Sequence, residues 1–158
     1  MVLLGGVEEA GRGPVIGPLV MCGVVIKEED EHKLVTIGTK DSKLLTPQTR
    51  ERIFDQVIHL VEQHEIIILQ PQDVDDSLND PNMNLNWLEA VTSAKIINKL
   101  KLDKVILDCP SNNPPAYKNY IMNHIENKNL DVLCEHKADL NYTVVAAASI
   151  IAKVTRDR

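Results

Sequence analysis

The chain has 158 residues, of which 44% are hydrophobic and 25% charged, and its formal net charge is −6. This length fits about one domain with its own core, and no apolar run approaches the roughly 18 residues of a membrane span. The acidic balance argues against nucleic-acid binding held mainly by counterion release, so a polyanionic ligand would need a local basic patch or bound cations.

Five apolar runs have the length and composition of β-strands. They cover residues 2–7, 19–26, 65–69, 104–108 and 131–136. The first two runs are separated only by a glycine-rich loop, so we expect them to pair as neighbours. The polar stretch 27–45 connects the second run to the first helix, and the acidic, proline-containing stretch 70–82 is predicted to be a loop.

Four helices are predicted between and after these strands. Thr46 and Pro47 make an N-cap and first turn for a helix to about His64, and Asn84 caps a second helix. A third, short helix covers about 116–126, and an alanine-rich helix covers 143–158. Strands that alternate with helices after the second strand predict an α/β domain over residues 1–158. It has a five-stranded mixed sheet with helices on both faces.

The N-terminal residues lack a basic segment that would precede a secretory signal, so we expect a cytoplasmic protein without membrane association. The three cysteines, Cys22, Cys109 and Cys134, are odd in number and widely spaced. They fit neither a disulfide framework nor a CxxC zinc site, and we expect reduced thiols.

Four carboxylates follow the predicted strands at the same edge of the sheet. Glu8 and Glu9 end the first strand, Asp108 ends the fourth, and Asp139 lies just beyond the fifth. Ligands of open α/β sheets bind at this edge. Four acids gathered there would repel one another unless a hard divalent cation such as Mg²⁺ or Mn²⁺ were bound to their oxygens.

Consecutive strand residues point to opposite faces, so Glu8 and Glu9 reach one site only if the strand ends or turns there. The stretch that follows them contains Gly11, Gly13 and Gly17. These glycines would supply the backbone freedom for such a turn, and their N–H groups can approach a sugar or phosphate closely.

Simpler interpretations of single residues stay open. Asp139 is also a suitable N-cap for the last helix, and Asp108 before Cys109 and Pro110 is also typical of a turn. Tyr142 taken alone fits a packing role, and Arg12 fits an ion pair with a neighbouring glutamate. The five histidines show no ligand spacing and are given no catalytic role here, although His136 lies only three residues before Asp139.

Several long motifs, in this order and spacing, resemble ribonuclease HII of the archaeal branch. They read GVEEAGRGPVIGP, TKDSKLLTPQTRERI, MNLNWLEA, VILDCP and EHKADLNYTVVAAASIIAKVTRDR. The resemblance covers nearly the whole chain, and its motifs are far more specific than a lone glycine pattern. It implies a ribonuclease H-like fold and cleavage of RNA in RNA–DNA hybrids, including single ribonucleotides in duplex DNA, with 5′-phosphate and 3′-hydroxyl products.

The resemblance also implies roles for individual residues. The metal-binding acids would be Glu8, Glu9, Asp108 and Asp139, holding two ions of Mg²⁺ or Mn²⁺ with substrate. Gly11, Arg12 and Gly13 would recognise the ribose 2′-hydroxyl, and Tyr142 would pack against that sugar. Lys43, Ser149 and Lys153 would lie near the phosphate backbone. The partners implied are RNA–DNA hybrid and ribonucleotide-containing duplex DNA, and we expect a monomer.

Two departures from the family pattern favour an alternative. The family usually has aspartate where this chain has Glu8, which is one methylene longer, and it usually continues past Arg158 with further helices. Together these features suggest a hybrid-binding module with weakened catalysis. A phosphate-binding metabolic enzyme of doubly wound type fits less well, because its glycine loop would lead into a helix and this one leads into the apolar run 19–26.

Overall fold

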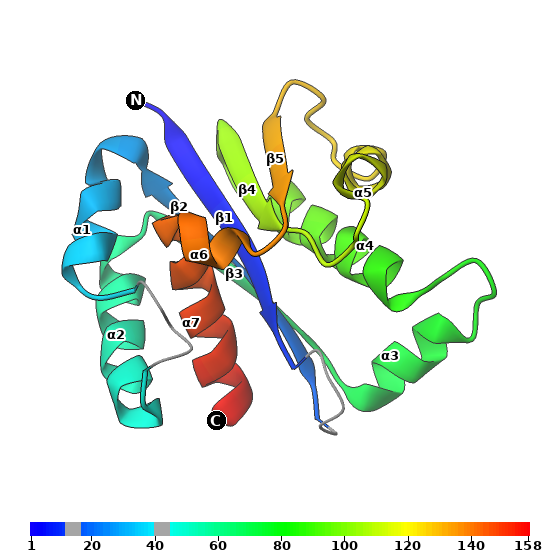
Figure 1. Cartoon of the computed structure of the whole chain (residues 1–158), viewed down its shortest axis with the longest axis horizontal. Coiled ribbons are helices and arrows are strands. Elements are labelled where there is room, and N and C mark those ends of the chain that lie inside the picture. The colour runs from blue at the N-terminus through cyan, green and yellow to red at the C-terminus, as the bar shows by residue number, and fades with distance from the viewer. Residues whose placement is uncertain (12–16, 40–44) are drawn as a thin grey trace.

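A computed structural model describes residues 1–11, 17–39 and 45–158 of the chain (Figure 1). Its five strands form one sheet in the order β3-β2-β1-β4-β5. The strands are β1 (Leu3–Ala10), β2 (Leu19–Lys27), β3 (Gln63–Leu69), β4 (Lys104–Asp108) and β5 (Asp131–Glu135). β2 is antiparallel to both β1 and β3, whereas β1, β4 and β5 are parallel. The sheet is therefore mixed, as predicted, and the first two strands are neighbours.

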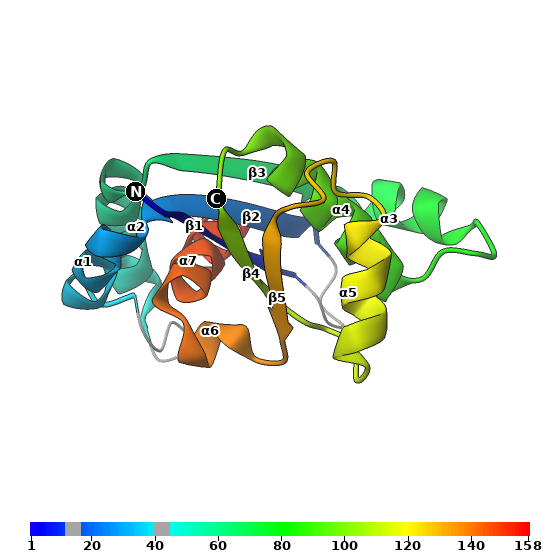
Figure 2. The ribbon, with the colours of Figure 1, turned by 90° about the horizontal axis from the view of Figure 1, so that it is seen from above.

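Helices cover both faces of the sheet (Figure 2). The helical elements are η1 (Glu28–Asp30), α1 (Glu31–Thr36), α2 (Pro47–Leu60), α3 (Pro71–Leu78), α4 (Leu85–Lys99), α5 (Pro114–Met122), α6 (Ala138–Asn141) and α7 (Thr143–Asp157). One core lies between the sheet and the helices α1, α2 and α7. The second core lies between the sheet and the helices α4 and α5. The prediction of an α/β fold with helices on both faces is confirmed.

Side-chain caps fix where several helices begin. Thr46 Oγ1 accepts a hydrogen bond from the Thr49 N–H at 3.2 Å, and Pro47 occupies the first turn of α2. Asn84 Oδ1 accepts from the Trp87 N–H at 2.9 Å at the start of α4. Each side chain satisfies a backbone donor that has no partner within the helix, and both caps were predicted from the sequence.

Helix α7 packs directly on β1. Its residues from Val144 to Ala152 are buried. A Cβ atom on Gly6 would lie 2.6 Å from the backbone carbon and oxygen of Val144, so the strand and the helix approach more closely than a side chain permits. Glycine at this position therefore fixes the distance between β1 and the start of α7.

Some boundaries differ from the sequence-based prediction. The stretch 70–82 is not simply a loop, because it contains α3, which begins with Pro71 and with a hydrogen bond from the Gln70 N–H to Asp73 Oδ2 at 2.9 Å. The polar stretch 27–45 contains η1 and α1. Helix α2 ends at Leu60, and β3 begins at Gln63, two residues before the predicted start. Short helices with few apolar residues carry little periodic signal, which explains why they were missed.

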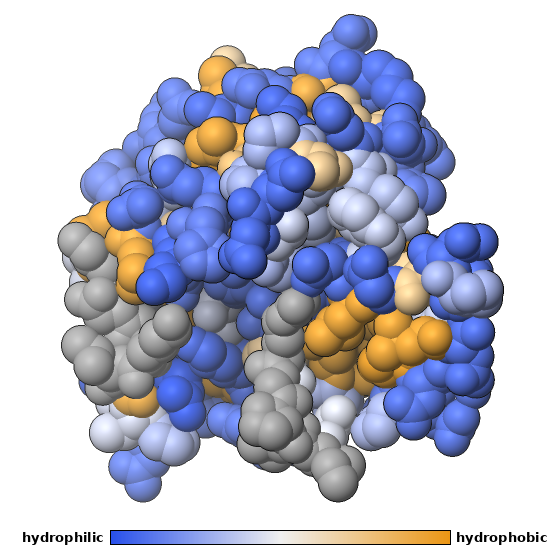
Figure 3. All heavy atoms as spheres, turned by 45° about the vertical axis from the view of Figure 1, so that its right-hand side comes forward, coloured by the Kyte–Doolittle hydropathy of each residue, from blue (hydrophilic) through white to orange (hydrophobic). Residues whose placement is uncertain are grey.

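The surface seen from the side of α3, α4 and α5 is mostly hydrophilic, with apolar side chains gathered right of its centre (Figure 3). Across the described ranges, no helix is both long enough and apolar enough to cross a membrane.

Candidate active site

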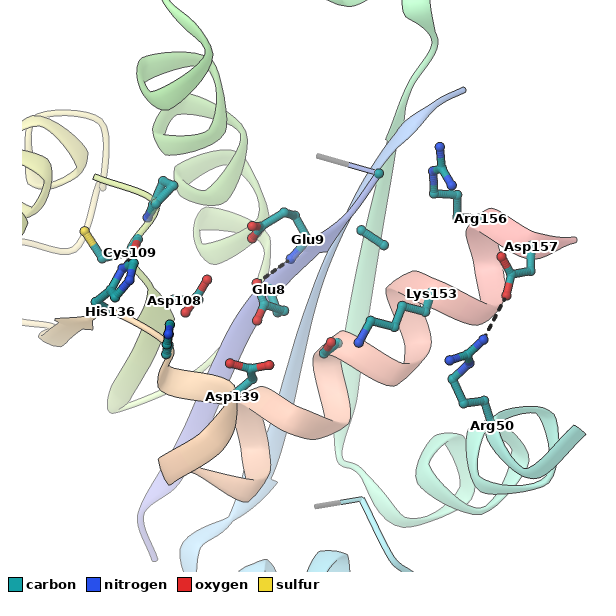
Figure 4. Close-up of a pocket in the computed structure, with 15 residues that line it drawn as sticks. Glu8, Glu9, Arg50, Asp108, Cys109, His136, Asp139, Lys153, Arg156 and Asp157 are labelled. Carbon is teal, nitrogen blue, oxygen red and sulfur yellow. Dashed lines mark hydrogen bonds and ion pairs between the residues drawn. The ribbon is translucent and has the colours of Figure 1, made fainter. Parts of the chain in front are cut away.

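Three carboxylates meet at the C-terminal ends of β1 and β4. Glu8 and Glu9 lie near the end of β1, and Asp108 is the last residue of β4. One carboxylate oxygen from each of the three residues lies within 4.8 Å of those of the other two. Figure 4 shows the side chains of Glu8, Glu9 and Asp108 facing a shared space. The predicted gathering of these three acids is present in the structure.

The backbone conformation of β1 at the two glutamates differs from the prediction. The strand neither ends nor turns at Glu8 and Glu9, because both pair with β2, opposite Cys22 and Met21. The prediction of a turn was wrong for a physical reason. The pairing of β1 with β4 ends at Val7, so the next residues of β1 have a free edge on that side.

Side chains from opposite faces of β1 converge around this free edge. Val7 lies in the core beneath α4 and Ala10 in the core beneath α7, so alternation places Glu8 on the α7 side and Glu9 on the α4 side. The Glu9 N–H donates a hydrogen bond to Glu8 Oε1 at 3.0 Å. This bond holds the Glu8 carboxylate against the strand edge and toward Glu9.

Asp108 and Asp139 are linked by the turn that follows β5. The Ala138 N–H donates to Asp108 Oδ1 at 2.9 Å, which fixes the Asp108 side chain at the start of α6. Lys137, just before α6, has a left-handed backbone with φ 57°, an uncommon conformation for a residue other than glycine. The resulting turn places Asp139 in the first turn of α6. Its carboxylate points toward Glu8 (Figure 4).

Asp139 lines the same cleft as the other three acids but lies outside the 4.8 Å group. The alternative that it caps the last helix does not hold, because Tyr142 is the N-cap residue of α7 and no side chain provides a capping hydrogen bond there.

Burial and neighbouring negative charge raise the pKa values of two of these acids, Glu8 and Asp108. Glu8 is only 5% exposed, and burial, followed by the charge of Glu9, raises its pKa well above the ordinary value. Burial and the charges of Glu9 and Asp139 raise the pKa of Asp108 to about 6, although the hydrogen bond from Ala138 opposes this shift. Carboxylates held in this way are costly when all are ionised, and a bound cation would remove that cost.

These acids form one end of a cleft of about 490 Å³. Ser149, Lys153 and Arg156 of α7 line it further along, because spacings of four and three residues place them on one helix face. Arg50 of α2 lies beside them, and its Nη2 is 3.7 Å from Asp157 Oδ2. Figure 4 shows Glu8, Glu9, Asp108 and Asp139 at one end of the cleft. At the other end lie Lys153, Arg156 and Arg50, the last paired with Asp157.

Of the basic and polar residues that line the cleft, the sequence-based prediction named Ser149 and Lys153 but not Arg50 or Arg156. Arg156 shares the α7 face of Lys153 and was detectable from helical spacing. Its Nε donates to the Pro18 carbonyl oxygen at 2.9 Å, which also ties α7 to the start of β2. Arg50 reaches the cleft only because α2 packs beside α7, and the sequence carries no local signal of that contact.

The other predicted substrate-binding residues are placed differently. Gly11 lines the cleft and has φ +98°, and a Cβ atom there would lie 2.3 Å from the Pro18 carbonyl oxygen, so the predicted need for glycine is met. Tyr142 does not line this cleft but a separate hollow that includes Glu31 and Thr143. Its role in sugar recognition stays a prediction. Arg12, Gly13 and Lys43 lie outside the described residues.

The family model of ribonuclease HII matches residues 5–158. The chain is 42% identical over 157 residues to a ribonuclease HII from Thermococcus sibiricus, an alignment that covers 98% of this chain and 68% of the relative. It is 39% identical over 155 residues to a ribonuclease HII from Pyrococcus abyssi, covering 97% and 67% of the two chains. The chain thus spans about two thirds of the length of these archaeal relatives.

Solved structures agree with this assignment. The crystal structure of ribonuclease H2 from Pyrococcus horikoshii OT3 superposes with a TM-score of 0.90 at 40% identity and covers 99% of this chain and 72% of that one. The ribonuclease HII of the PCNA complex from Archaeoglobus fulgidus gives a TM-score of 0.88 at 36% identity, with 98% and 72% covered. With its motifs, its sheet order and its acidic cleft, the chain belongs to the ribonuclease HII family, whose enzymes cleave the RNA of RNA–DNA hybrids.

Proposed function

We propose that this chain is an endonuclease that uses Glu8, Glu9, Asp108 and Asp139 with two divalent cations, Mg²⁺ or Mn²⁺. It hydrolyses the RNA strand of RNA–DNA hybrids and cuts at single ribonucleotides in duplex DNA. The observation that carries this proposal is the meeting of three carboxylates within 4.8 Å at one end of a cleft whose other end is basic. A phosphodiester backbone lying in such a cleft would have cation-held phosphate at one end and lysine and arginine at the other.

The residues present fit divalent cations. All candidate donors are carboxylate oxygens, which are the preferred ligands of Mg²⁺ and suit Mn²⁺. Glu8 uses one oxygen for the Glu9 N–H, which leaves its second oxygen for a cation. The raised pKa values of Asp108 and Glu8 support this fit, because they reflect burial together with neighbouring negative charge that the site's own hydrogen bonds do not compensate.

When bound, a pair of such cations lowers the pKa of an attacking water and neutralises charge on the scissile phosphate and the leaving oxygen. The protein's own residues do the rest. Glu8, Glu9 and Asp108 would hold the cations at the strand ends, and Asp139 would complete the set from α6. Lys153 of α7 supplies positive charge to the phosphates that follow along the strand.

Selection of a ribonucleotide requires a group that senses the 2′-hydroxyl. Gly11 exposes backbone in the cleft beside Glu9, and its left-handed φ depends on the absence of a side chain. We propose that this backbone, together with Arg12 and Gly13, contacts the ribose and that Tyr142 packs against the same sugar. We also propose that the protein acts as a monomer.

The test is cleavage of a duplex that carries one ribonucleotide, with each strand labelled in turn and with Mg²⁺ or Mn²⁺. We expect one cut in the ribonucleotide-containing strand, leaving 5′-phosphate and 3′-hydroxyl ends, and no cut without a divalent cation. An all-DNA duplex is the matched control and should remain intact. Tight binding of the hybrid without any cleavage would support the alternative of a binding module instead.

A further inference from the structure

We propose that His136 is a further catalytic residue, which accepts a proton at Nε2 from the water that attacks the scissile phosphate. The inference rests on the proposed nuclease function, and it concerns a side chain that the carboxylate cluster does not account for. His136 follows β5, is exposed, and lines the acidic end of the cleft together with Asp108 (Figure 4).

The hydrogen bond of the ring fixes its tautomer. His136 Nδ1 lies 3.1 Å from the carbonyl oxygen of Cys109. A carbonyl oxygen only accepts hydrogen bonds, so Nδ1 must carry the proton. In the neutral ring the lone pair therefore lies on Nε2, the ring nitrogen that is not bonded to the Cys109 carbonyl. The backbone of Cys109, directly after Asp108, thus orients a base beside the carboxylates.

The ring of His136 lies among charged side chains from several parts of the fold. The charged groups that line this end of the cleft are Glu8 and Glu9 from β1, Asp108 from β4, and Lys137 and Asp139 from the segment after β5. The Cys109 thiol stays neutral near pH 7, because burial raises its pKa. Exposure of the ring to solvent lets it return the proton to water after each turnover.

The step balances without a further reactant. The water oxygen forms a bond to phosphorus, the bond between phosphorus and the 3′-oxygen breaks, and one proton of the water passes to His136 Nε2. The 3′-oxygen takes a proton from solvent, and His136 then releases its proton to solvent. The sum is hydrolysis of one phosphodiester to a 5′-phosphate and a 3′-hydroxyl.

Two variants separate this role from a structural one. In His136→Asn the new amide keeps an N–H near the position of Nδ1, so it can still donate to the Cys109 carbonyl, but no atom remains at the position of Nε2. We expect its cleavage rate at saturating substrate to fall about 10²-fold, with its melting temperature and Mn²⁺ affinity unchanged. His136→Ala should lose a similar factor and regain part of it when free imidazole is added. The cleavage rate of His136→Ala should no longer show the decrease at low pH that protonation of a catalytic histidine would cause.

His59 offers a matched control, because its Nδ1 also lies within hydrogen-bond distance of a backbone carbonyl, that of Asp55, at 2.6 Å, but it does not line the cleft. His59→Asn should cleave at the wild-type rate. Wild-type cleavage together with an equal rate for His136→Asn would overturn the role of His136 while leaving the proposed function intact. Absence of cleavage by the wild-type chain under both metals would overturn the function and this step with it.

Discussion

The Glu9 N–H and the Glu8 carboxylate form a 3.0 Å hydrogen bond between adjacent residues of one strand. Because pairing with β4 stops at Val7, this bond satisfies a backbone group at a free strand edge and at the same time aims a buried carboxylate at its neighbours. The additional methylene of Glu8, compared with the aspartate usual in the family, gives the side chain the length to bend back in this way. The longer residue is therefore accommodated by the local structure.

Two substitutions of Glu8 distinguish the effect of its negative charge from the effect of its hydrogen bond to the Glu9 N–H. Glu8→Gln keeps an oxygen that accepts from the Glu9 N–H, so we expect the fold to persist while cleavage falls at least about 10²-fold. Glu8→Asp keeps the charge but shortens the arm, so the free energy of unfolding should drop by about 1 kcal/mol through the lost hydrogen bond while measurable cleavage remains. Urea unfolding without metal and cleavage with Mn²⁺ measure the two effects. Equal cleavage by Glu8→Gln and the wild type would contradict the role of this carboxylate.

The pKa of Asp108 predicts how the metal-free stability depends on pH. Its value rises from the ordinary 3.8 to about 6 in the folded protein, so the folded state holds this proton more tightly than the unfolded state. The free energy of unfolding should therefore decrease as pH rises from about 4 to about 6 and stay low above that range. Allowing for solvent screening at this half-buried site, the loss is on the order of 1 kcal/mol.

Asp108→Asn checks this sign directly, because asparagine keeps an acceptor for the Ala138 N–H and has no proton to lose in this range. The variant should be more stable than the wild type at pH 7 in the presence of a chelator, and this difference should vanish near pH 4. Its cleavage activity should be abolished. A variant that is less stable than the wild type at pH 7 would show that the carboxylate stabilises the fold.

Divalent cations should stabilise the folded protein through the same acids. A ligand at 100 times its dissociation constant adds about 2.7 kcal/mol to the free energy of unfolding if it binds only the folded state. We expect Mn²⁺ to raise the melting temperature of the wild type and to have little effect on Glu9→Gln. Glu29→Gln, on the exposed turn η1, is the matched control and should respond like the wild type. An equal response of Glu9→Gln would place the cation elsewhere.

Lys153 is predicted to act on phosphate through its charge. Lys153→Ala should weaken hybrid binding and reduce the slope of log affinity against log salt by about one, as expected for the loss of one phosphate contact. Lys99→Ala removes a lysine whose partner is Glu65 and which does not line the cleft. The slope of this control should match that of the wild type. Filter binding in a chelator across a salt series separates this effect from catalysis.

Much of this architecture was predictable because strands and long helices carry strong periodic signals. The apolar run 104–108 matched β4 residue for residue, and Asn84 was identified as the cap of α4. The four acids could be assigned to one sheet edge because each lies at or just beyond the end of a predicted strand. What the sequence did not reveal depends on contacts between distant segments. The free edge of β1 exists only because β4 stops opposite Val7, and Arg50 lines the cleft only because α2 packs beside α7.

The distance between β1 and α7 should determine both the stability of the fold and the position of Lys153 relative to the acids. In Gly6→Ala the new Cβ would lie 2.6 Å from the Val144 backbone, and backbone cannot move aside as a side chain can. We expect a loss of about 1–3 kcal/mol in the free energy of unfolding. Because a displaced α7 carries Lys153 away from the acids, hybrid affinity should also fall under conditions where the variant remains folded.

Gly5→Ala provides the control for this effect. Its Cβ would meet Leu102 Cδ1 at 2.5 Å, which is the far end of a flexible side chain on the opposite face of the sheet from α7. Its destabilisation should therefore be smaller, and its hybrid affinity should equal that of the wild type once both proteins are folded. If Gly5→Ala and Gly6→Ala lost the same stability and the same affinity, close packing of α7 on β1 would not be what positions the basic wall of the cleft.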